Sequence, residues 1–267
     1  MNRLDGKVAL ISGAARGIGG EAARLMAAAG ARVVIGDVLH DRARQTVAAI
    51  TAAGGDAAFA PLDVTQETAW TAAIGLAVSR YGRLDILVNN AGVFIGKGIE
   101  EISLAEWDRL VAVNMTGVFL GTRLAAPALR DAARSSPHGS VIVNLASIAG
   151  IVGSQLDPLY SMTKGGVTLF TKSTALEFAR KGYRIRANSI HPGVIDTDMG
   201  EQTFVSRAQR TGSNDTAPLR QAFAGSVPSG RLGLPIDIAN GIVFLASDDS
   251  AYMNGAGLVV DGGVTAA

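Results

Sequence analysis

The amino-acid sequence predicts an α/β fold in which seven parallel strands form an open, doubly wound sheet with helices on both faces. Short apolar runs alternate with longer alanine-rich stretches along almost the whole chain, as in parallel strands joined by crossover helices. The short runs are continuously apolar rather than alternating, which is typical of strands buried on both faces. The 267 residues show no repeat or linker, so we expect a single domain over residues 1–267.

The expected elements follow one another in a regular order. Residues 17–30 place Ile18, Leu25 and Met26 at helical spacing and end at Gly30, which suits a left-handed helix cap. Further helices are expected near residues 40–53, 65–80, 103–130, 158–181 and 235–247. The strand candidates are residues 7–12, 31–37, 57–63, 84–90, 139–147, 184–192 and 257–263.

One segment, residues 196–228, departs from this rhythm. It mixes Gly, Ser, Thr, Asn and Pro with isolated apolar residues such as Phe204 and Phe223. Connections longer than about 15 residues without structure of their own are uncommon in a compact domain and are usually functional. The segment is either a lid or an irregular helical insertion, and we favour a substrate lid.

Composition and charge exclude several classes of protein. The net charge of +1 and the pI near 8.1 argue against nucleic acid or an anionic membrane as a partner. The chain contains no cysteine, and none of its three histidines has a second ligand at metal-binding spacing, so we expect no metal. We identify no apolar run of membrane-spanning length and no signal peptide, because Asp5 and Lys7 interrupt the N-terminus; the expected location is the cytoplasm.

A glycine-rich motif, SGAARGIG at residues 12–19, follows the first expected strand and opens the first helix. Glycines allow a tight turn and a close approach of the backbone to a pyrophosphate, whose charge suits the amides and dipole of the helix start. The alternative for a glycine triplet is a plain tight turn. We expect phosphate contacts from Gly13, Arg16, Gly17, Ile18 and Gly19.

Asp37 closes the second expected strand, 18 positions after Gly19 (37 − 19), close to the spacing of a carboxylate that binds the adenosine ribose. A carboxylate accepts hydrogen bonds from free ribose hydroxyls and repels the 2′-phosphate of NADP. NAD is therefore the expected cofactor and NADP the less favoured one, although Arg16 and Arg42 are nearby cations that weaken the preference. The alternative for Asp37 is a cap of the next helix.

Tyr160 and Lys164 lie four residues apart in the segment LYSMTK, so on a helix their side chains share one face. Such a pair serves either chemistry or packing. Ser147 lies 13 positions before Tyr160 (160 − 147), at the carboxyl end of an expected strand, where open parallel sheets bind their ligands.

Together these pieces resemble the short-chain dehydrogenase/reductase family over nearly the whole chain. The matching pieces are SGAARGIG, Asp37, LDV at residues 62–64, NNAG at 89–92, Asn114, Ser147, YSMTK, PGVIDT and the terminal VVDGG. The resemblance implies a Rossmann-type fold and a complete nicotinamide cofactor site. It assigns Asp63 and Val64 to the adenine, Asn90, Ala91 and Gly92 to the adenine ribose, and Pro192, Gly193, Ile195 and Thr197 to the nicotinamide.

The resemblance implies that Asn114, Ser147, Tyr160 and Lys164 are the catalytic residues. Tyr160 is the expected general acid/base, and Ser147 is expected to orient the reacting oxygen. Lys164 is expected to lower the pKa of Tyr160 several units below its ordinary value of about 10 and to bond the nicotinamide ribose. Asn114 is expected to hold a water of a proton relay; its alternative is a buried asparagine satisfied locally. His191 is expected to line the pocket rather than to act as a rival base.

The expected substrate pocket is mostly apolar. Its lining residues are Ser147, Gln155, Leu156, Tyr160, Val194, Met199 and Phe204. Because no arginine is among them, we expect a hydrophobic secondary or cyclic alcohol or ketone that exchanges hydride with NAD. The alternatives are a hydroxysteroid dehydrogenase, a 3-oxoacyl carrier-protein reductase, which Asp37 and the near-zero net charge disfavour, and an NAD-binding redox sensor that is no enzyme. The resemblance also implies a homotetramer.

Overall fold

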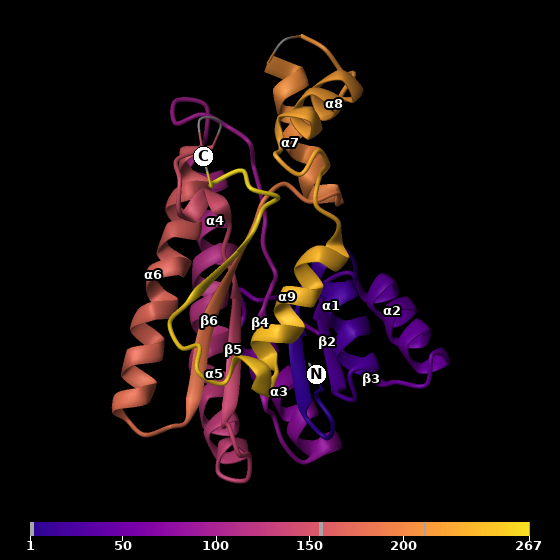
Figure 1. The fold of residues 1–267 in the computed structure, drawn as a ribbon, viewed down its shortest axis with the longest axis vertical. Coiled ribbons are helices and arrows are strands. Elements are labelled where there is room, and N and C mark those ends of the chain that lie inside the picture. The colour runs from indigo at the N-terminus through magenta and orange to yellow at the C-terminus, as the bar shows by residue number, and fades with distance from the viewer. Residues whose placement is uncertain (1–2, 155–156, 211, 267) are drawn as a thin grey trace.

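Seven parallel strands form one sheet in the computed structural model, which describes residues 3–154, 157–210 and 212–266. Across the sheet the strands run β3-β2-β1-β4-β5-β6-β7, so the chain winds outward from β1 first to one edge and then to the other. Their bounds are Val8–Ser12 (β1), Arg32–Asp37 (β2), Asp56–Pro61 (β3), Ile86–Asn89 (β4), Ser140–Leu145 (β5), Ile185–Pro192 (β6) and Gly257–Val260 (β7). This order confirms the predicted doubly wound, Rossmann-type class (Figure 1).

Helices cover both faces of the sheet, as the continuously apolar strands predict (Figure 1). The helices that pack on it are α1 (Gly17–Ala28), α2 (His40–Ala52), α3 (Glu67–Tyr81), α5 (Gly117–Ala133), α6 (Pro158–Arg180) and α9 (Pro235–Ala246). One apolar core joins α1, α2 and α9 to strand residues such as Ala9 and Ile11. The other joins α3, α5 and α6 to Val8 and Leu10, so alternate side chains of β1 enter opposite cores.

The ends of the helices follow local sequence signals. Gly30 after α1 and Gly82 after α3 have positive φ values of 99° and 80°, as expected of left-handed caps. Ser103 and Glu106 form a capping box at the start of α4 (Leu104–Val111), in which each side chain bonds the other residue's backbone. Pro158 occupies the first turn of α6, where a missing N–H costs nothing.

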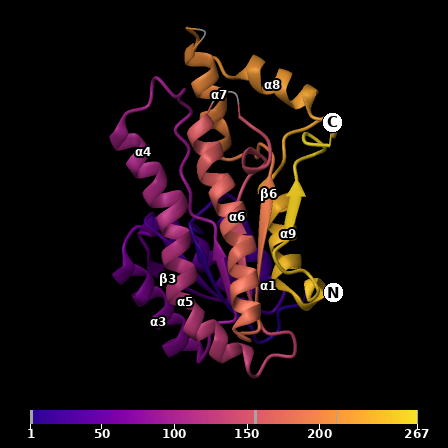
Figure 2. The same cartoon turned by 90° about the vertical axis from the view of Figure 1, so that its left-hand side faces the viewer.

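α4 continues through a π-helical turn at Ala112–Thr116 into α5, which gives one helical run over Leu104–Ala133. By length and composition alone this run meets the criterion for a membrane span, with a mean hydropathy of 1.2 over its apolar window. The sequence-based statement that no such run exists is therefore wrong. In the fold, α5 lies against β4, β5 and α3 as a core helix, a position that also requires apolar residues (Figure 2). The cytoplasmic location stays a prediction.

Residues 196–228, which we call the lid segment, contain two helices, α7 (Asp198–Arg210) and α8 (Ala217–Ser226). Both helices lie beyond the carboxyl ends of the strands (Figures 1 and 2). Phe204 of α7 meets Phe223 of α8 edge to face, with ring centroids 5.9 Å apart. The segment is thus built largely as a helical insertion, and its action as a substrate lid stays a prediction.

Candidate active site

The glycine-rich turn between β1 and α1 is packed too tightly for side chains. A Cβ on Gly13 would lie 2.7 Å from Cα of Ala91, and a Cβ on Gly19 would lie 2.4 Å from the amide nitrogen of Asn90. The Asn90 amide donates to the carbonyls of Ser12 and Gly13 (3.0 and 2.8 Å). The Ser12 hydroxyl accepts from the backbone N–H groups of Asn90 and Ala91 (3.1 and 3.2 Å). These bonds hold the ends of β1 and β4 together and fix the shape of the turn.

The start of α1 offers backbone donors to an anion. Within the described residues, the N-cap Arg16 makes no side-chain capping bond, and the first turn contains no acidic residue. The N–H groups of Gly17, Ile18 and Gly19 therefore have no side-chain cap. Among the described residues, a Cβ on Gly17, whose φ is +59°, would meet only the side chain of Thr197, with its methyl group at 3.6 Å. Uncapped amides beside open space fit the pyrophosphate of a dinucleotide.

Asp37 ends β2 next to this turn and is 7% exposed. One of its oxygens accepts from the N–H of Ala15 (2.8 Å) and the other from the N–H of Leu39 (2.9 Å). A carboxylate has about four acceptor positions, so about two remain for ribose hydroxyls. The alternative role as the cap of α2 does not hold, because the N-cap residue of α2 is Leu39, which makes no side-chain capping bond with a described residue.

Asp63 and Val64 follow β3 and differ in what they offer a nucleotide. One oxygen of Asp63 accepts from the N–H and the hydroxyl of Thr65 (2.9 and 2.8 Å), and the side chain is exposed. Val64 is 6% exposed, and its carbonyl already accepts from the indole of Trp70 (3.0 Å). The second oxygen of Asp63 therefore suits the expected adenine contact better than the carbonyl of Val64 does.

Tyr160 and Lys164 lie on one face of α6, near the start of the helix, as their spacing predicts. The ammonium of Lys164 lies 5.7 Å from the centre of the Tyr160 ring and donates to the carbonyl of Leu145 (2.7 Å) at the end of β5. Lys164 is 5% exposed, and burial lowers its pKa to about 8. A Cβ on Gly92 would lie 3.7 Å from this ammonium. The lysine is thus anchored between the ends of β4 and β5 and is still mostly charged at neutral pH.

Ser147 hydrogen-bonds the phenol of Tyr160, so the two side chains meet as expected. We expected the pKa of Tyr160 to lie below its ordinary value. For the protein's own groups acting together, this prediction is wrong. Burial raises the pKa of Tyr160 above its ordinary value, the bond to Ser147 lowers it by less, and the carboxylate of Asp157 raises it further. Removal of the phenolate from water outweighs the protein's own stabilisation of its charge.

Asp157 is a site residue that the sequence analysis missed. It is fully buried (0% exposed), and its carboxylate accepts from the N–H of Tyr160 (2.8 Å) and from the N–H of Gly96 (3.0 Å). It therefore caps α6 and ties the end of that helix that carries Tyr160 to the segment after β4. The local signal was available: an aspartate directly before Pro158 is a strong N-cap pattern.

Asn114 lies in the π-helical turn and is 1% exposed. Its amide oxygen accepts from the N–H of Val93 (2.8 Å), and its nitrogen donates to the carbonyl of Val93 (2.9 Å) and to the hydroxyl of Thr163 (3.3 Å). Thr163 in turn donates to the carbonyl of Tyr160 (2.9 Å). The side chain is thus satisfied locally and braces α6, while the expected proton relay stays a prediction.

His191 is not a pocket-lining residue, contrary to expectation. It is 1% exposed, and its two ring nitrogens lie 2.8 Å from the hydroxyl of Ser189 and 3.0 Å from the carbonyl of Ser147. Burial lowers the pKa of His191, which favours the neutral ring. The histidine therefore supports the backbone of Ser147 from behind. The sequence gives no signal for this contact, because 44 positions separate the two residues.

The segment after β6 turns closely under the sheet edge. A Cβ on Gly193 would lie 3.0 Å from Cα of Asp261, and Ile195 is 5% exposed. The hydroxyl of Thr197 donates to the carbonyl of Ile195 (3.3 Å) and accepts from the N–H of Gly200 (3.1 Å). Thr197 thus lies directly before α7, and its hydroxyl already makes two hydrogen bonds within the chain. Its expected hydrogen bond to the nicotinamide carboxamide stays a prediction.

The expected substrate residues divide into three groups. Gln155 and Leu156 lie outside the described residues. Val194 and Met199 are half-buried, as side chains at a pocket wall would be. Phe204 is only 1% exposed and packs inside the lid segment, so it has almost no surface to offer a substrate. Phe94 was not expected: its ring meets that of Tyr160 edge to face, with centroids 5.3 Å apart.

The lid segment contacts the glycine-rich turn directly. Arg16 at the start of α1 forms an ion pair with Asp198 at the start of α7. Both side chains are about half exposed, so the pair contributes little to stability. The pair is informative because of its position: it joins the expected phosphate site to the lid segment.

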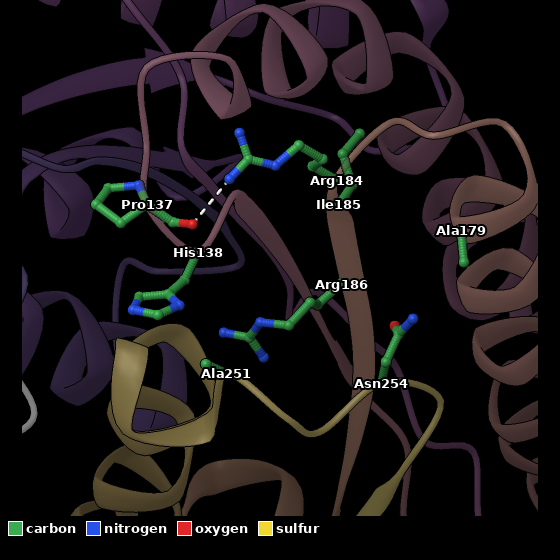
Figure 3. A pocket seen from close by; sticks show the side chains of 8 residues that line it. All are labelled: Pro137, His138, Ala179, Arg184, Ile185, Arg186, Ala251 and Asn254. Atoms are coloured by element: carbon green, nitrogen blue, oxygen red, sulfur yellow. Dashed lines mark hydrogen bonds between the residues drawn. The ribbon is translucent and has the colours of Figure 1, made fainter.

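A hollow of about 250 Å³ at the amino ends of the strands lies away from this site (Figure 3). Its lining residues are Pro137, His138, Ala179, Arg184, Ile185, Arg186, Ala251 and Asn254. The guanidinium of Arg184 donates to carbonyls at the end of α5, and that of Arg186 donates to carbonyls at the end of α9. These arginines complement helix C-termini, although Nε of Arg186 is buried without a partner among the described residues.

Comparisons with known proteins agree with this geometry. A family model described as enoyl-(acyl carrier protein) reductase matches residues 13–265. Trans-4-hydroxycyclohexanecarboxylate dehydrogenase of Sinomonas cyclohexanicum is 43% identical, over 99% of this chain and 95% of that protein. A 3-alpha-(or 20-beta)-hydroxysteroid dehydrogenase of Mycobacterium bovis is also 43% identical, over 99% of this chain and 91% of the relative. The crystal structure of levodione reductase matches with a TM-score of 0.91 at 32% identity, over 99% of this chain and 100% of that one.

Proposed function

Since the chain belongs to the short-chain dehydrogenase/reductase family of oxidoreductases, we propose that it is an NAD-dependent dehydrogenase of cyclic secondary alcohols and the corresponding ketones. The observation that carries the proposal is the grouping of Ser147, Tyr160 and Lys164 at the carboxyl ends of β4 and β5; β4 neighbours β1, which leads into the glycine-rich turn. Ligands of open parallel sheets bind at these carboxyl ends. A redox sensor without turnover would need the turn but not this group.

The residues around the turn fit a nicotinamide dinucleotide. When bound, the cofactor supplies the carbon that accepts or donates hydride, a chemistry that side chains lack. The uncapped amides of Gly17, Ile18 and Gly19 would hold its pyrophosphate, and the remaining acceptor positions of Asp37 would hold two ribose hydroxyls. The charge of Asp37 would repel a 2′-phosphate, which favours NAD over NADP.

In the proposed reaction, Tyr160 takes the proton of the alcohol during oxidation and returns it to the ketone oxygen during reduction. Ser147 donates to the reacting oxygen and keeps it beside the phenol. Because burial raises the pKa of Tyr160, the chain alone favours the protonated phenol, which is the form that ketone reduction needs. Alcohol oxidation needs the tyrosinate, and the charges of Lys164 and of the oxidised nicotinamide ring favour it.

A ring-borne hydroxyl is the substrate feature that the relatives support best. Two proteins that are 43% identical act, by their names, on a hydroxycyclohexane and on hydroxysteroids. The aromatic face of Phe94 next to Tyr160 gives such a ring an apolar surface. Hydroxysteroid oxidation is the second candidate, because the steroid-specific relative is equally similar to this chain.

The test is a turnover panel read at the absorbance of the reduced nicotinamide. Cyclohexanol, cyclopentanol, 4-hydroxycyclohexanecarboxylate, a hydroxysteroid and a linear secondary alcohol are each offered with NAD and with NADP. We expect cyclic alcohols to be oxidised with NAD, and Tyr160→Phe to be inactive on all of them. A preference for the steroid would select the second candidate, and turnover with NADP alone would overturn the role given to Asp37. No turnover of any alcohol or ketone, with the cofactor still bound, would favour the redox sensor.

We also propose a homotetramer in which α6 pairs with its copy. Three apolar side chains on α6 are 59%, 66% and 73% exposed, namely Met162, Leu169 and Leu176. They are spaced seven residues apart, so they form one stripe along the helix. Sedimentation equilibrium measures the assembly, and Leu169→Glu should dissociate it.

A further inference from the structure

Arg207 on α7 is a cation of the lid segment that has no anionic partner among the residues that the structure describes. The other arginines of the segment that the structure describes are paired: Arg210 with Glu101, and Arg220 with Asp196 and Glu201. Arg207 makes no ion pair with a described residue, and its Nε atom is buried without a hydrogen-bond partner. Its guanidinium instead lies over the ring of Phe223, 5.5 Å from the ring centre.

Arg207 lies on the side of α7 that faces the segment after β4. It lines a hollow too tight to hold a water molecule, so a ligand reaches its guanidinium only when α7 moves away from the segment after β4. The other lining residues are Phe94, Gly96, Thr203, Ser206 and Arg210. α7 touches the segment after β4 closely, because a Cβ on Gly96 would lie 2.3 Å from the hydroxyl of Ser206. Phe94, which shares the hollow with Arg207, meets the ring of Tyr160 with centroids 5.3 Å apart. Phe94 therefore links the proposed reacting centre to the unpaired guanidinium.

The position of Arg207 is unfavourable unless an anion joins it. Burial lowers the pKa of Arg207, which reflects the cost of holding its charge away from water. A guanidinium stays protonated in proteins all the same, so the cost falls on the folded state. A carboxylate offers two oxygens in the geometry of the guanidinium fork and would supply the missing acceptor.

We propose that Arg207 selects, among the cyclic alcohols and ketones of the proposed function, those that carry a carboxylate remote from the reacting carbon. The proposal rests on the proposed function and adds the charge of the substrate to it. The hydroxyl end of such a molecule lies at Tyr160, its ring lies along Phe94, and its carboxylate reaches Arg207. A single guanidinium balances a monoanion, whereas a phosphate dianion would keep excess charge in this partly buried place. The proposal departs from the expectation of a pocket without arginine, which considered no residue of α7 other than Met199 and Phe204.

Binding of a non-reactive acid tests the inference without turnover. Isothermal titration calorimetry measures the Kd of cyclohexanecarboxylate and of the neutral cyclohexanecarboxamide, each with and without saturating NAD. We expect the acid to bind about 10- to 100-fold more tightly than the amide, the usual range for a charge-assisted hydrogen-bonded pair. Arg207→Gln should remove that difference, and Arg207→Lys should retain part of it.

The matched control is Arg134→Gln, which removes the same charge from an exposed side chain at the end of α5. It should leave the preference for the acid unchanged. Thermal melting of each variant establishes that the fold is retained. Equal affinity of the wild-type protein for acid and amide in both titrations, or a preference that survives in Arg207→Gln, would overturn the inference.

Kinetics separate this inference from the proposed function. With NAD, kcat/KM for 4-hydroxycyclohexanecarboxylate should exceed that for cyclohexanol about 10-fold or more. Arg207→Gln should raise KM for the carboxylate substrate and leave kcat nearly unchanged. Oxidation of both alcohols at equal efficiency would refute the role of Arg207 and leave the proposed function intact. Arg207-dependent binding of the acid without turnover of any alcohol would refute the proposed function and leave the carboxylate site intact.

Discussion

Replacement of Lys164 by methionine should stabilise the protein at neutral pH while abolishing its turnover. Lys164 is 5% exposed, and its ammonium donates to the carbonyl of Leu145 at 2.7 Å. Burial lowers its pKa from 10.5 to about 8. Methionine fills a similar volume with an unbranched chain and brings no charge that must lose its water.

The sign of the effect follows from proton linkage. Between pH 8 and pH 10.5 the unfolded chain keeps Lys164 protonated while the folded chain has released the proton, so this residue stabilises the fold increasingly as pH rises. At about pH 7 the folded state bears nearly the whole penalty, about 3 kcal/mol at about 1.4 kcal/mol per pKa unit. Loss of the bond to Leu145 removes about 1 kcal/mol. We therefore expect Lys164→Met to raise the free energy of unfolding by about 2 kcal/mol at neutral pH.

Urea unfolding followed by tryptophan fluorescence measures this difference at several pH values from about 7 to about 10. The advantage of the variant should shrink as pH rises and should vanish near the upper end. The control is Lys172→Met, which changes an exposed lysine two turns further along α6 and should leave the free energy of unfolding nearly unchanged. A variant less stable than the wild type at neutral pH, or a difference that does not vary with pH, would refute the reasoning.

Tyr160→Phe should leave NAD binding nearly unchanged and lower kcat about 1000-fold, since only the proton path is lost; retained turnover in stopped assays would contradict the role of Tyr160. Gly13→Ala should abolish NAD binding by calorimetry, because its Cβ would lie 2.7 Å from Cα of Ala91, whereas Gly54→Ala, at a similar positive φ but with nothing within 4 Å, should bind normally. Asp157→Asn should lower the free energy of unfolding by about 2 kcal/mol, because an amide cannot accept both backbone N–H bonds in the same way. It should also move the pH profile of alcohol oxidation toward lower pH, since it removes a negative charge that raises the pKa of Tyr160; an unshifted profile would count against this coupling.

The sheet was predictable because each of its inner strands is buried on both faces. The predicted run at 139–147 contains β5 at Ser140–Leu145, all six residues of which are buried. The helices of the lid segment were harder to recognise. α7 buries only Phe204 and Ala208 among its described residues and is otherwise polar, so it lacks the broad apolar stripe of a core helix. It also packs on α8 rather than on the sheet.

The site was predictable as far as local spacing reaches. A separation of four positions places Tyr160 and Lys164 on one face of a helix, whatever the rest of the fold is. The bond from Asp157 to Gly96 spans 61 positions and required the fold itself. The raised pKa of Tyr160 was missed for another reason: the sequence argument considered nearby charges, whereas desolvation depends on the atoms packed around the phenol.

The carboxylate of Asp157 joins Gly96, which lines the hollow at Arg207, to Tyr160, the proposed base, in one mechanical unit. Any remodelling that shifts Gly96 to admit a bulkier ring will pull on the turn that carries Tyr160. Attempts to broaden the range of substrates by shifting Gly96 should therefore lose proton transfer before they lose affinity. Changes confined to α7 leave that carboxylate untouched and are the safer route to altered selectivity.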